Sequence, residues 1–161
     1  MIPSIPACGG EQPAINRVSP TTDFVPSLTL SADILIVEDE MLVACEMEAI
    51  LEENGYRCAG IVPDMTAARG FFGEPLDLAL VDLNLRDGFT GPQIGEQLSR
   101  SGIPVIFITA NPALLGDGIA GAVGVLTKPT DEETLLQAVS FALGSRAGRS
   151  VLPPAAMKLF G

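Results

Sequence analysis

The sequence contains no histidine, and this absence removes several classes of functional site at once. Without histidine the chain cannot carry Ser-His-Asp or Cys-His catalysis in their usual forms, nor a histidine-ligated metal site. It also cannot carry a phosphohistidine of its own. Any chemistry has to rest on other side chains.

Positive charge is scarce. Nine Lys and Arg residues face twenty Asp and Glu residues, which gives a net charge of −11. Binding to phosphate backbones or to anionic membrane surfaces depends on clustered positive charge. We therefore expect no nucleic-acid partner, no membrane partner and no DNA-binding output module.

Long hydrophobic runs and paired cysteines are also missing. No run reaches the ~18 apolar residues that a transmembrane helix needs, and the first residues lack the positive and apolar regions of a signal peptide. Cys8, Cys45 and Cys58 are odd in number and widely spaced, which suits neither a disulfide framework nor a zinc cluster. Reduced thiols and a cytoplasmic location are the expectation.

The chain divides into three parts by composition. Residues 1–31 carry five prolines and three charged residues without helical or strand periodicity, so we expect a disordered leader. Residues 32–144 carry regular apolar patterns, and 47% of the 161 residues are hydrophobic, enough for one buried core. Residues 145–161 lose the pattern and are expected to form a mostly unstructured C-terminal tail.

Within 32–144, short apolar runs alternate with helical patterns. Nearly continuous apolar runs are typical of parallel strands buried on both faces. The sequence predicts a doubly wound five-stranded parallel α/β sheet with helices on both faces. The expected strands are Ile34–Val37, Cys58–Val62, Leu78–Val81, Ile103–Ile108 and Ala122–Leu126, and the expected helices are 40–53, 64–72, 91–100, 112–119 and 132–144.

Polar residues follow four of these five strands. The first strand ends in residues 38–40 (Glu-Asp-Glu), the third in Asp82, the fourth in Thr109 and the fifth in Lys128. In an open parallel sheet, ligands bind at the carboxyl ends of the strands. We therefore expect three kinds of group at one edge: carboxylates, a hydroxyl and an ammonium.

Each of these residues also has an ordinary structural explanation. Acidic residues after a strand often cap the next helix, threonine favours strands, and lysine is usually solvated. Asp82 is the exception, because Leu-Asn-Leu-Arg follows it rather than a helix start. Together the groups suit Mg²⁺, which binds carboxylate oxygens, and a carboxylate that accepts a phosphoryl group. A lysine and a metal would neutralise charge on the phosphoryl oxygens.

Four segments, in this order and at these strand ends, resemble the receiver domain of two-component response regulators. They are Leu-Ile-Val-Glu38-Asp39-Glu40, Leu-Val-Asp82-Leu-Asn84, Phe-Ile-Thr109-Ala110 and Leu-Thr-Lys128-Pro129. The resemblance covers roughly residues 32–144 and implies a flavodoxin-like fold. The first motif and the stretch around Thr109 look like the stand-alone and PhyR-like receivers of alphaproteobacteria.

The resemblance implies a role for each matching residue. Asp82 would accept the phosphoryl group and would bind Mg²⁺ directly, together with Asp39 and the backbone carbonyl of Asn84. Glu38 would reach the ion through a water molecule. Thr109 would bond the phosphoryl group as a switch hydroxyl.

The remaining matches concern Lys128 and the fifth strand. Lys128, before a cis peptide bond to Pro129, would pair with a phosphoryl oxygen. The family commonly has an aromatic residue three positions before this lysine, where the chain has Val125, so the usual threonine–aromatic switch lacks its aromatic partner here. The segment that joins the fourth and fifth strands has four glycines within nine residues: Gly116, Gly118, Gly121 and Gly124. Interior glycines weaken helices, so the helix in this segment should be short or malleable.

The leading hypothesis is a single-domain response regulator, phosphorylated by a histidine kinase or a histidine phosphotransfer protein. It would be no enzyme beyond its own phosphorylation and dephosphorylation. Its output would be contact with a downstream protein of unknown identity or service as a phosphate sink, and homodimerisation is left open. One alternative is an unphosphorylated pseudo-receiver that acts as a binding module. Another is a haloacid-dehalogenase-type phosphatase, which needs an acid at the position of Asn84.

Overall fold

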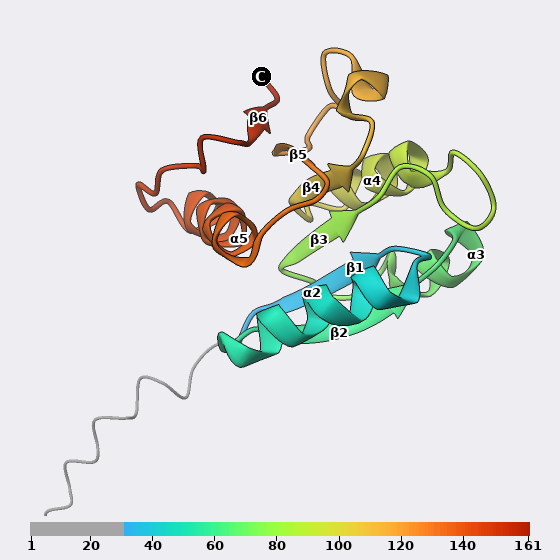
Figure 1. The fold of residues 1–161 in the computed structure, drawn as a ribbon, viewed down its shortest axis with the longest axis horizontal. Coiled ribbons are helices and arrows are strands. Elements are labelled where there is room, and N and C mark those ends of the chain that lie inside the picture. Colours follow the sequence, from blue (N-terminus) through green and yellow to red (C-terminus); the bar gives the residue numbers. More distant parts are fainter. Residues whose placement is uncertain (1–30) are drawn as a thin grey trace, which may run out of the picture. The chain divides into compact units, whose positions relative to one another are not determined.

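The computed structural model describes residues 31–161, and the expectation of a disordered leader lies outside these residues. Five parallel strands form the sheet, with a sixth, antiparallel strand at one edge, in the order β2-β1-β3-β4-β5-β6 (Figure 1). The strands are β1 (Asp33–Val37), β2 (Arg57–Val62), β3 (Leu78–Val81), β4 (Val105–Thr109), β5 (Gly124–Thr127) and β6 (Lys158–Leu159). The predicted doubly wound α/β architecture is confirmed, and β6 is an addition to it.

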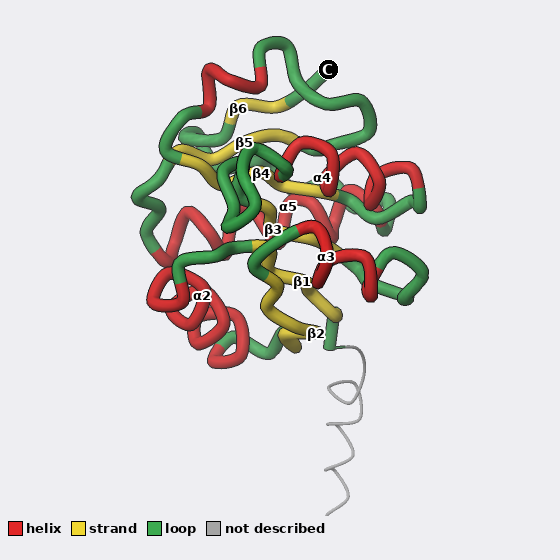
Figure 2. The backbone as a smooth tube through the Cα atoms, turned by 90° about the vertical axis from the view of Figure 1, so that its right-hand side faces the viewer, coloured by secondary structure: helices red, strands yellow, loops and turns green. Residues whose placement is uncertain are grey.

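The helices connect the strands and cover both faces of the sheet. Figure 2 shows α2 on one side of the strands and α3 and α4 on the other. The helices are α2 (Met41–Glu53), α3 (Met65–Ala68), α4 (Gly91–Arg100) and α5 (Glu132–Arg146), with 3-10 turns η2 (Arg69–Phe71) and η3 (Pro112–Leu115). No helix among residues 31–161 is long and apolar enough to cross a membrane.

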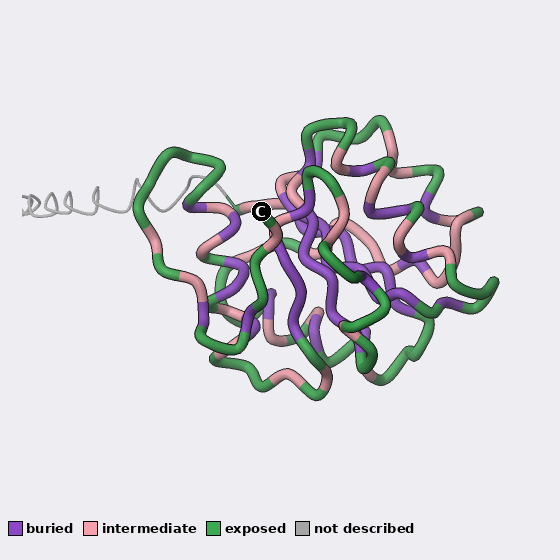
Figure 3. The backbone as a smooth tube through the Cα atoms, turned by 90° about the horizontal axis from the view of Figure 1, so that it is seen from above, coloured by how far each residue is buried: buried purple, intermediate pink, exposed green. Residues whose placement is uncertain are grey.

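Two hydrophobic clusters hold these layers together, because successive side chains of a strand point to opposite faces. In β1, Ile34 and Ile36 pack with α2 and α5, whereas Leu35 and Val37 pack with the α3 and α4 side. The residues of β1, β3 and β4 are almost completely buried. Figure 3 shows buried segments, in purple, running through the middle of the molecule. Such burial explains why these strands are apolar on both faces.

The segment between β4 and β5 contains only the 3-10 turn η3 where the sequence predicts a helix over 112–119. The expectation of a short element is confirmed, but that of a full helix is wrong. Gly116 and Gly118 have φ values of +55° and +114°, which end helical geometry. The loop that follows Thr109 is therefore irregular from residue 116 onward.

The prediction of a mostly unstructured tail over 145–161 is wrong in part. Few of its residues have regular secondary structure, but Lys158 and Leu159 pair with β5 as β6, and Met157 is buried with the α2 and α5 cluster. The chain turns back on α5, because the backbone N–H of Arg149 donates to Gly144 O over 2.8 Å. The tail thereby extends the sheet beyond β5.

Candidate functional site

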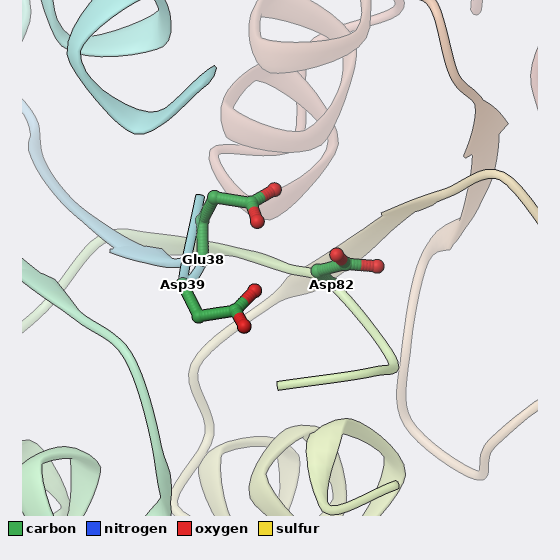
Figure 4. Close-up of side chains that lie close together, drawn as sticks. All are labelled: Glu38, Asp39 and Asp82. Carbon is green, nitrogen blue, oxygen red and sulfur yellow. The ribbon is translucent and has the colours of Figure 1, made fainter. Parts of the chain in front are cut away.

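The carboxyl ends of β1, β3, β4 and β5 bring the predicted polar residues together. Glu38 directly follows β1, Asp82 follows β3, Thr109 ends β4 and Lys128 follows β5. Because β1 and β3 are neighbours in the sheet, one carboxylate oxygen from each of Glu38, Asp39 and Asp82 lies within 4.8 Å of the others. Figure 4 shows these three side chains at the ends of the two strands.

Burial distinguishes this group from ordinary surface residues. Among the described residues, the buried polar or charged side chains are Glu38 (1% exposed), Asp82 (8%) and Thr109 (1%). All three belong to the predicted site. Buried charges in proteins are normally paired or coordinate metals, because an isolated charge loses its hydration.

Lys128 supplies the pairing charge. Its Nζ donates to Glu38 Oε2 over 2.6 Å and to Asp82 Oδ2 over 2.9 Å, and it lies 3.9 Å from Glu40 Oε1. The peptide bond between Lys128 and Pro129 is cis, as the sequence resemblance implies. The ammonium group therefore bridges the carboxylates of two adjacent strands.

The protonation equilibria reflect this arrangement. Burial raises the pKa of the Glu38 carboxyl, although the hydrogen bonds it accepts from Lys128 Nζ and from the Glu40 backbone N–H act in the opposite direction. Burial lowers the pKa of Lys128, but the hydrogen bonds to Glu38 and Asp82 outweigh this effect and leave the pKa above its ordinary value. The lysine is thus held in its charged form at neutral pH.

A cavity of about 320 Å³ opens beside these groups. Asp82 lines this cavity. Its Oδ2 accepts a hydrogen bond from Lys128 Nζ, and its Oδ1 accepts one from the backbone N–H of Leu83 over 2.7 Å. The lining residues are Asp39, Glu40, Asp82, Asn84, Thr109, Ala110, Asn111 and Lys128. A carboxylate at the wall of a cavity that also holds an ammonium and a hydroxyl can act as a nucleophile toward an anionic group.

The donor set also fits a hard divalent cation. It consists of oxygen atoms only, and two of its members, Asp39 and Asp82, line the cavity. Mg²⁺ binds one or two carboxylates and keeps several waters, so this set matches its preference. Glu38 is 1% exposed and does not line the cavity, whereas Asp39 and Asp82 do, so Asp39 and Asp82 are the carboxylates best placed for direct ligation.

Helix capping does not account for the acidic residues after β1. Glu40 occupies the N-cap position of α2 but its side chain makes no capping hydrogen bond, and the first turn of α2 holds no acidic residue. Two other aspartates show what a cap looks like in this chain, because Asp64 accepts from Ala67 N and Asp131 from Thr134 N. The cluster after β1 is arranged differently.

Some neighbours of the site were missed from the sequence. Ala110 and Asn111 line the cavity, and the backbone N–H of Asn111 donates to Thr109 Oγ1 over 3.1 Å. Their position directly after Thr109 is the signal that could have identified them. A larger, mainly apolar cavity of about 450 Å³ lies between α2 and α5 and also reaches Lys128 and Pro129.

Val125 stands where many receivers have an aromatic residue, and it is buried in the cluster on the α3 and α4 side. An aromatic contact nevertheless occurs nearby, between Phe107 of β4 and Phe160 of the tail, with ring centroids 6.4 Å apart. Phe160 comes from the segment that pairs with β5, two residues beyond the partner of Val125.

Comparisons with known proteins point to one family. Residues 34–140 match the family model described as the response regulator receiver domain. The phyllosphere-induced regulator PhyR of Methylorubrum extorquens is 37% identical over 86 residues, which are 52% of this chain and 32% of that protein. Protein PilH of Pseudomonas aeruginosa is 33% identical over 125 residues, covering 70% of this chain and 98% of PilH.

The fold gives the same result. The receiver domain of PhyR from Erythrobacter litoralis, solved by NMR, superimposes with a TM-score of 0.66 at 33% identity and covers 76% of this chain and 97% of that one. The chain spans only about a third of the M. extorquens PhyR and about half of the mycobacterial RegX3 proteins, to which it is 31% identical.

Proposed function

Because the chain belongs to the receiver domain family of response regulators, we propose that Asp82 accepts a phosphoryl group from a phosphohistidine. Because the sequence has no histidine, the phosphohistidine belongs to another protein, and the proposed donor is a histidine kinase or a histidine phosphotransfer protein. One observation carries the proposal: the Asp82 carboxylate lies at the cavity wall, 2.9 Å from Lys128 Nζ and beside the carboxylates of Glu38 and Asp39.

The transfer is a displacement at phosphorus. An oxygen of Asp82 attacks, a P–O bond forms and the P–N bond to the donor imidazole breaks, after which the imidazole takes up a proton from solvent. Lys128 moves its ammonium from the carboxylate to a phosphoryl oxygen, where negative charge spreads in the transition state. Thr109 donates its hydroxyl to another phosphoryl oxygen once the group is in place.

Mg²⁺ is the proposed cofactor. Asp39, Asp82 and the backbone carbonyl of Asn84 would hold the ion, and Glu38 would act through water, consistent with its absence from the cavity lining. When bound, the ion neutralises charge on the phosphoryl oxygens. It also offsets the repulsion among three carboxylates that Lys128 alone has to balance.

The output is proposed to be contact with a downstream protein or removal of phosphate from a relay. A PhyR protein of Bartonella quintana, 25% identical with a TM-score of 0.65, is described as an anti-anti-sigma factor and is longer than this chain, which covers 57% of it. A protein contact as output is therefore in keeping with this part of the family.

The experiment is incubation with acetyl phosphate and Mg²⁺, followed by intact mass measurement. We expect one phosphoryl adduct on wild type and none on folded Asp82→Asn. Glu53→Gln is the control, because Glu53 is an exposed carboxylate at the end of α2 and does not line the cavity. Labelling of Asp82→Asn at the wild-type rate would contradict the assignment. A folded wild type without adduct would support the pseudo-receiver, and continuous release of phosphate would support the phosphatase.

A further inference from the structure

The outer edge of β5 is covered by the chain's own C-terminus. β6 pairs with β5 in antiparallel register, Gly124 opposite Leu159 and Val125 opposite Lys158. The backbone N–H of Phe160 also donates to Val123 O over 3.0 Å. Without this strand, the edge of β5 would present unpaired backbone groups, which is the usual template for adding another strand.

The tail is attached at a second place, the glycine-rich segment before β5. Lys158 Nζ donates to the carbonyl of Gly116 over 3.0 Å. The ring of Phe160 lies directly on Gly118, where an added Cβ would be 2.5 Å from Phe160 Cγ. The ring also packs near Phe107 of β4, with ring centroids 6.4 Å apart. The tail therefore bridges the sheet and residues 116–118.

Residues 116–118 are continuous with the proposed phosphoryl site. Thr109 lies seven residues before Gly116. Its Oγ1 accepts a hydrogen bond from the backbone N–H of Asn111, and Asn111 lines the cavity. Between them lies only the single turn η3, whose Leu115 is buried. A change at Thr109 thus reaches Gly116 through one short turn rather than through a packed helix.

The attachment of the tail is also weak enough to be reversible. β6 has two residues, and Leu159 remains 46% exposed. The β5–β6 pairing spans only two residue pairs, so the anchoring depends mainly on Phe160, Lys158 and the buried Met157. Loss of two of these contacts would favour release.

We propose that β6 is a releasable strap over the β5 edge and that its attachment is coupled to the phosphoryl site through residues 110–118. This inference rests on the proposed function, because the trigger is the phosphoryl group on Asp82. To donate to a phosphoryl oxygen, the Thr109 hydroxyl reorients and alters its hydrogen bond with Asn111. The segment follows, the Gly116 carbonyl and Gly118 leave Lys158 and Phe160, and the β5 edge is uncovered.

Coupling of this kind is reciprocal. If phosphorylation weakens the strap, a weaker strap must favour the phosphorylated state. Phe160→Ala removes the ring that contacts Gly118 and Phe107. Lys158→Met removes the hydrogen bond to the Gly116 carbonyl. Because the Lys158 side chain is exposed, this substitution leaves the core intact. Leu159→Ala is the matched control, because it changes an exposed side chain in the same strand.

The test combines hydrogen exchange with intact mass on the full chain, with Mg²⁺ and with or without acetyl phosphate. In labelled wild type we expect amide exchange in 122–126 and 157–160 to rise by about 5-fold or more, the lower end of typical allosteric coupling. Phe160→Ala and Lys158→Met should show faster exchange there before labelling and a larger labelled fraction, whereas Leu159→Ala should match wild type.

Two outcomes overturn the inference. Labelled wild type with unchanged exchange in both segments refutes the coupling while the proposed function stands. Equal labelled fractions in wild type and Lys158→Met, despite faster tail exchange in the variant, refute it as well. If no phosphoryl adduct appears on the mass spectrum, the proposed function fails and the coupling fails with it.

Discussion

Removal of the Lys128 ammonium tests the electrostatic balance of the site most directly. In Lys128→Met the stem keeps a similar volume, but Glu38 and Asp82 lose the group that bridges them at 2.6 and 2.9 Å. Glu38 is 1% exposed, so its charge has no access to bulk water. Breaking a buried ion pair by removing one partner typically costs 3–5 kcal/mol. Because Asp82 borders an open cavity, we expect about 3 kcal/mol, or a fall in Tm of about 10 °C for a domain of this size.

The pH dependence of this loss follows from Glu38. Burial raises the pKa of Glu38 in the folded protein above its usual 4.5, so the folded state binds this proton more tightly than the unfolded state. The stability that this gives is fully present below the unfolded pKa and is lost as the pH rises through the folded pKa. Without Lys128 the folded pKa rises further, so the penalty should be largest at neutral pH and should shrink toward pH 4.5.

The assay is urea unfolding of wild type, Lys128→Met, Glu38→Gln and the double variant, at pH 7 and pH 5, without divalent cations. If the cost comes from an unpaired buried carboxylate, the double variant recovers most of the loss at pH 7. A loss in Lys128→Met that is the same at both pH values, and is not recovered by Glu38→Gln, would refute this reasoning and point to lost packing of the lysine stem.

The other predictions concern the metal and the backbone beside Asp82. Millimolar Mg²⁺ should stabilise wild type by RT ln(1 + [Mg²⁺]/Kd) and thereby raise its Tm. Asp39→Ala should remove most of that gain while sparing metal-free stability; a capping role would instead give a metal-independent loss of about 0.5–2 kcal/mol. Gly91→Ala should destabilise by about 1–3 kcal/mol and lower acetyl phosphate labelling, because its methyl group would overlap the Asp82 carbonyl oxygen. Gly70→Ala, with open space around its Cβ position, is the control, and equal melting curves for the two glycine variants would contradict the overlap.

The sequence predicts well those features that depend on local pattern. The run Leu78–Val81 is apolar at every position, and it forms β3 with the same bounds, buried on both faces. Asp82 then stands at the strand end because the apolar run stops there. The helix at 91–100 is also found with its predicted bounds. In each case one short segment contains the whole physical signal.

Features that depend on distant partners are harder to predict. The ion pair between Lys128 and Glu38 joins residues 90 positions apart, and periodicity says nothing about which strands are neighbours. The position of both residues after strands predicts that they share one edge of the sheet, but it does not predict that they lie close enough to pair. The end of α5 was missed for a similar reason: Gly144 looks like a stop signal, yet the helix continues to Arg146. The missing Cβ of Gly144 leaves room for Val151 of the returning tail.

The same reasoning explains why the tail was read as unstructured. A two-residue strand is too short for alternation to show, so Met157, Leu159 and Phe160 carry no periodic signal. Their signal lies in another segment, in the glycines before and within β5. Gly118 accommodates the Phe160 ring, and at Gly124 a side chain would overlap the Lys158 carbonyl oxygen. Glycine in or beside a strand often marks close approach of another backbone. Gly118 weakens a helix over 112–119, and together with Gly124 it provides the surface on which the tail lies.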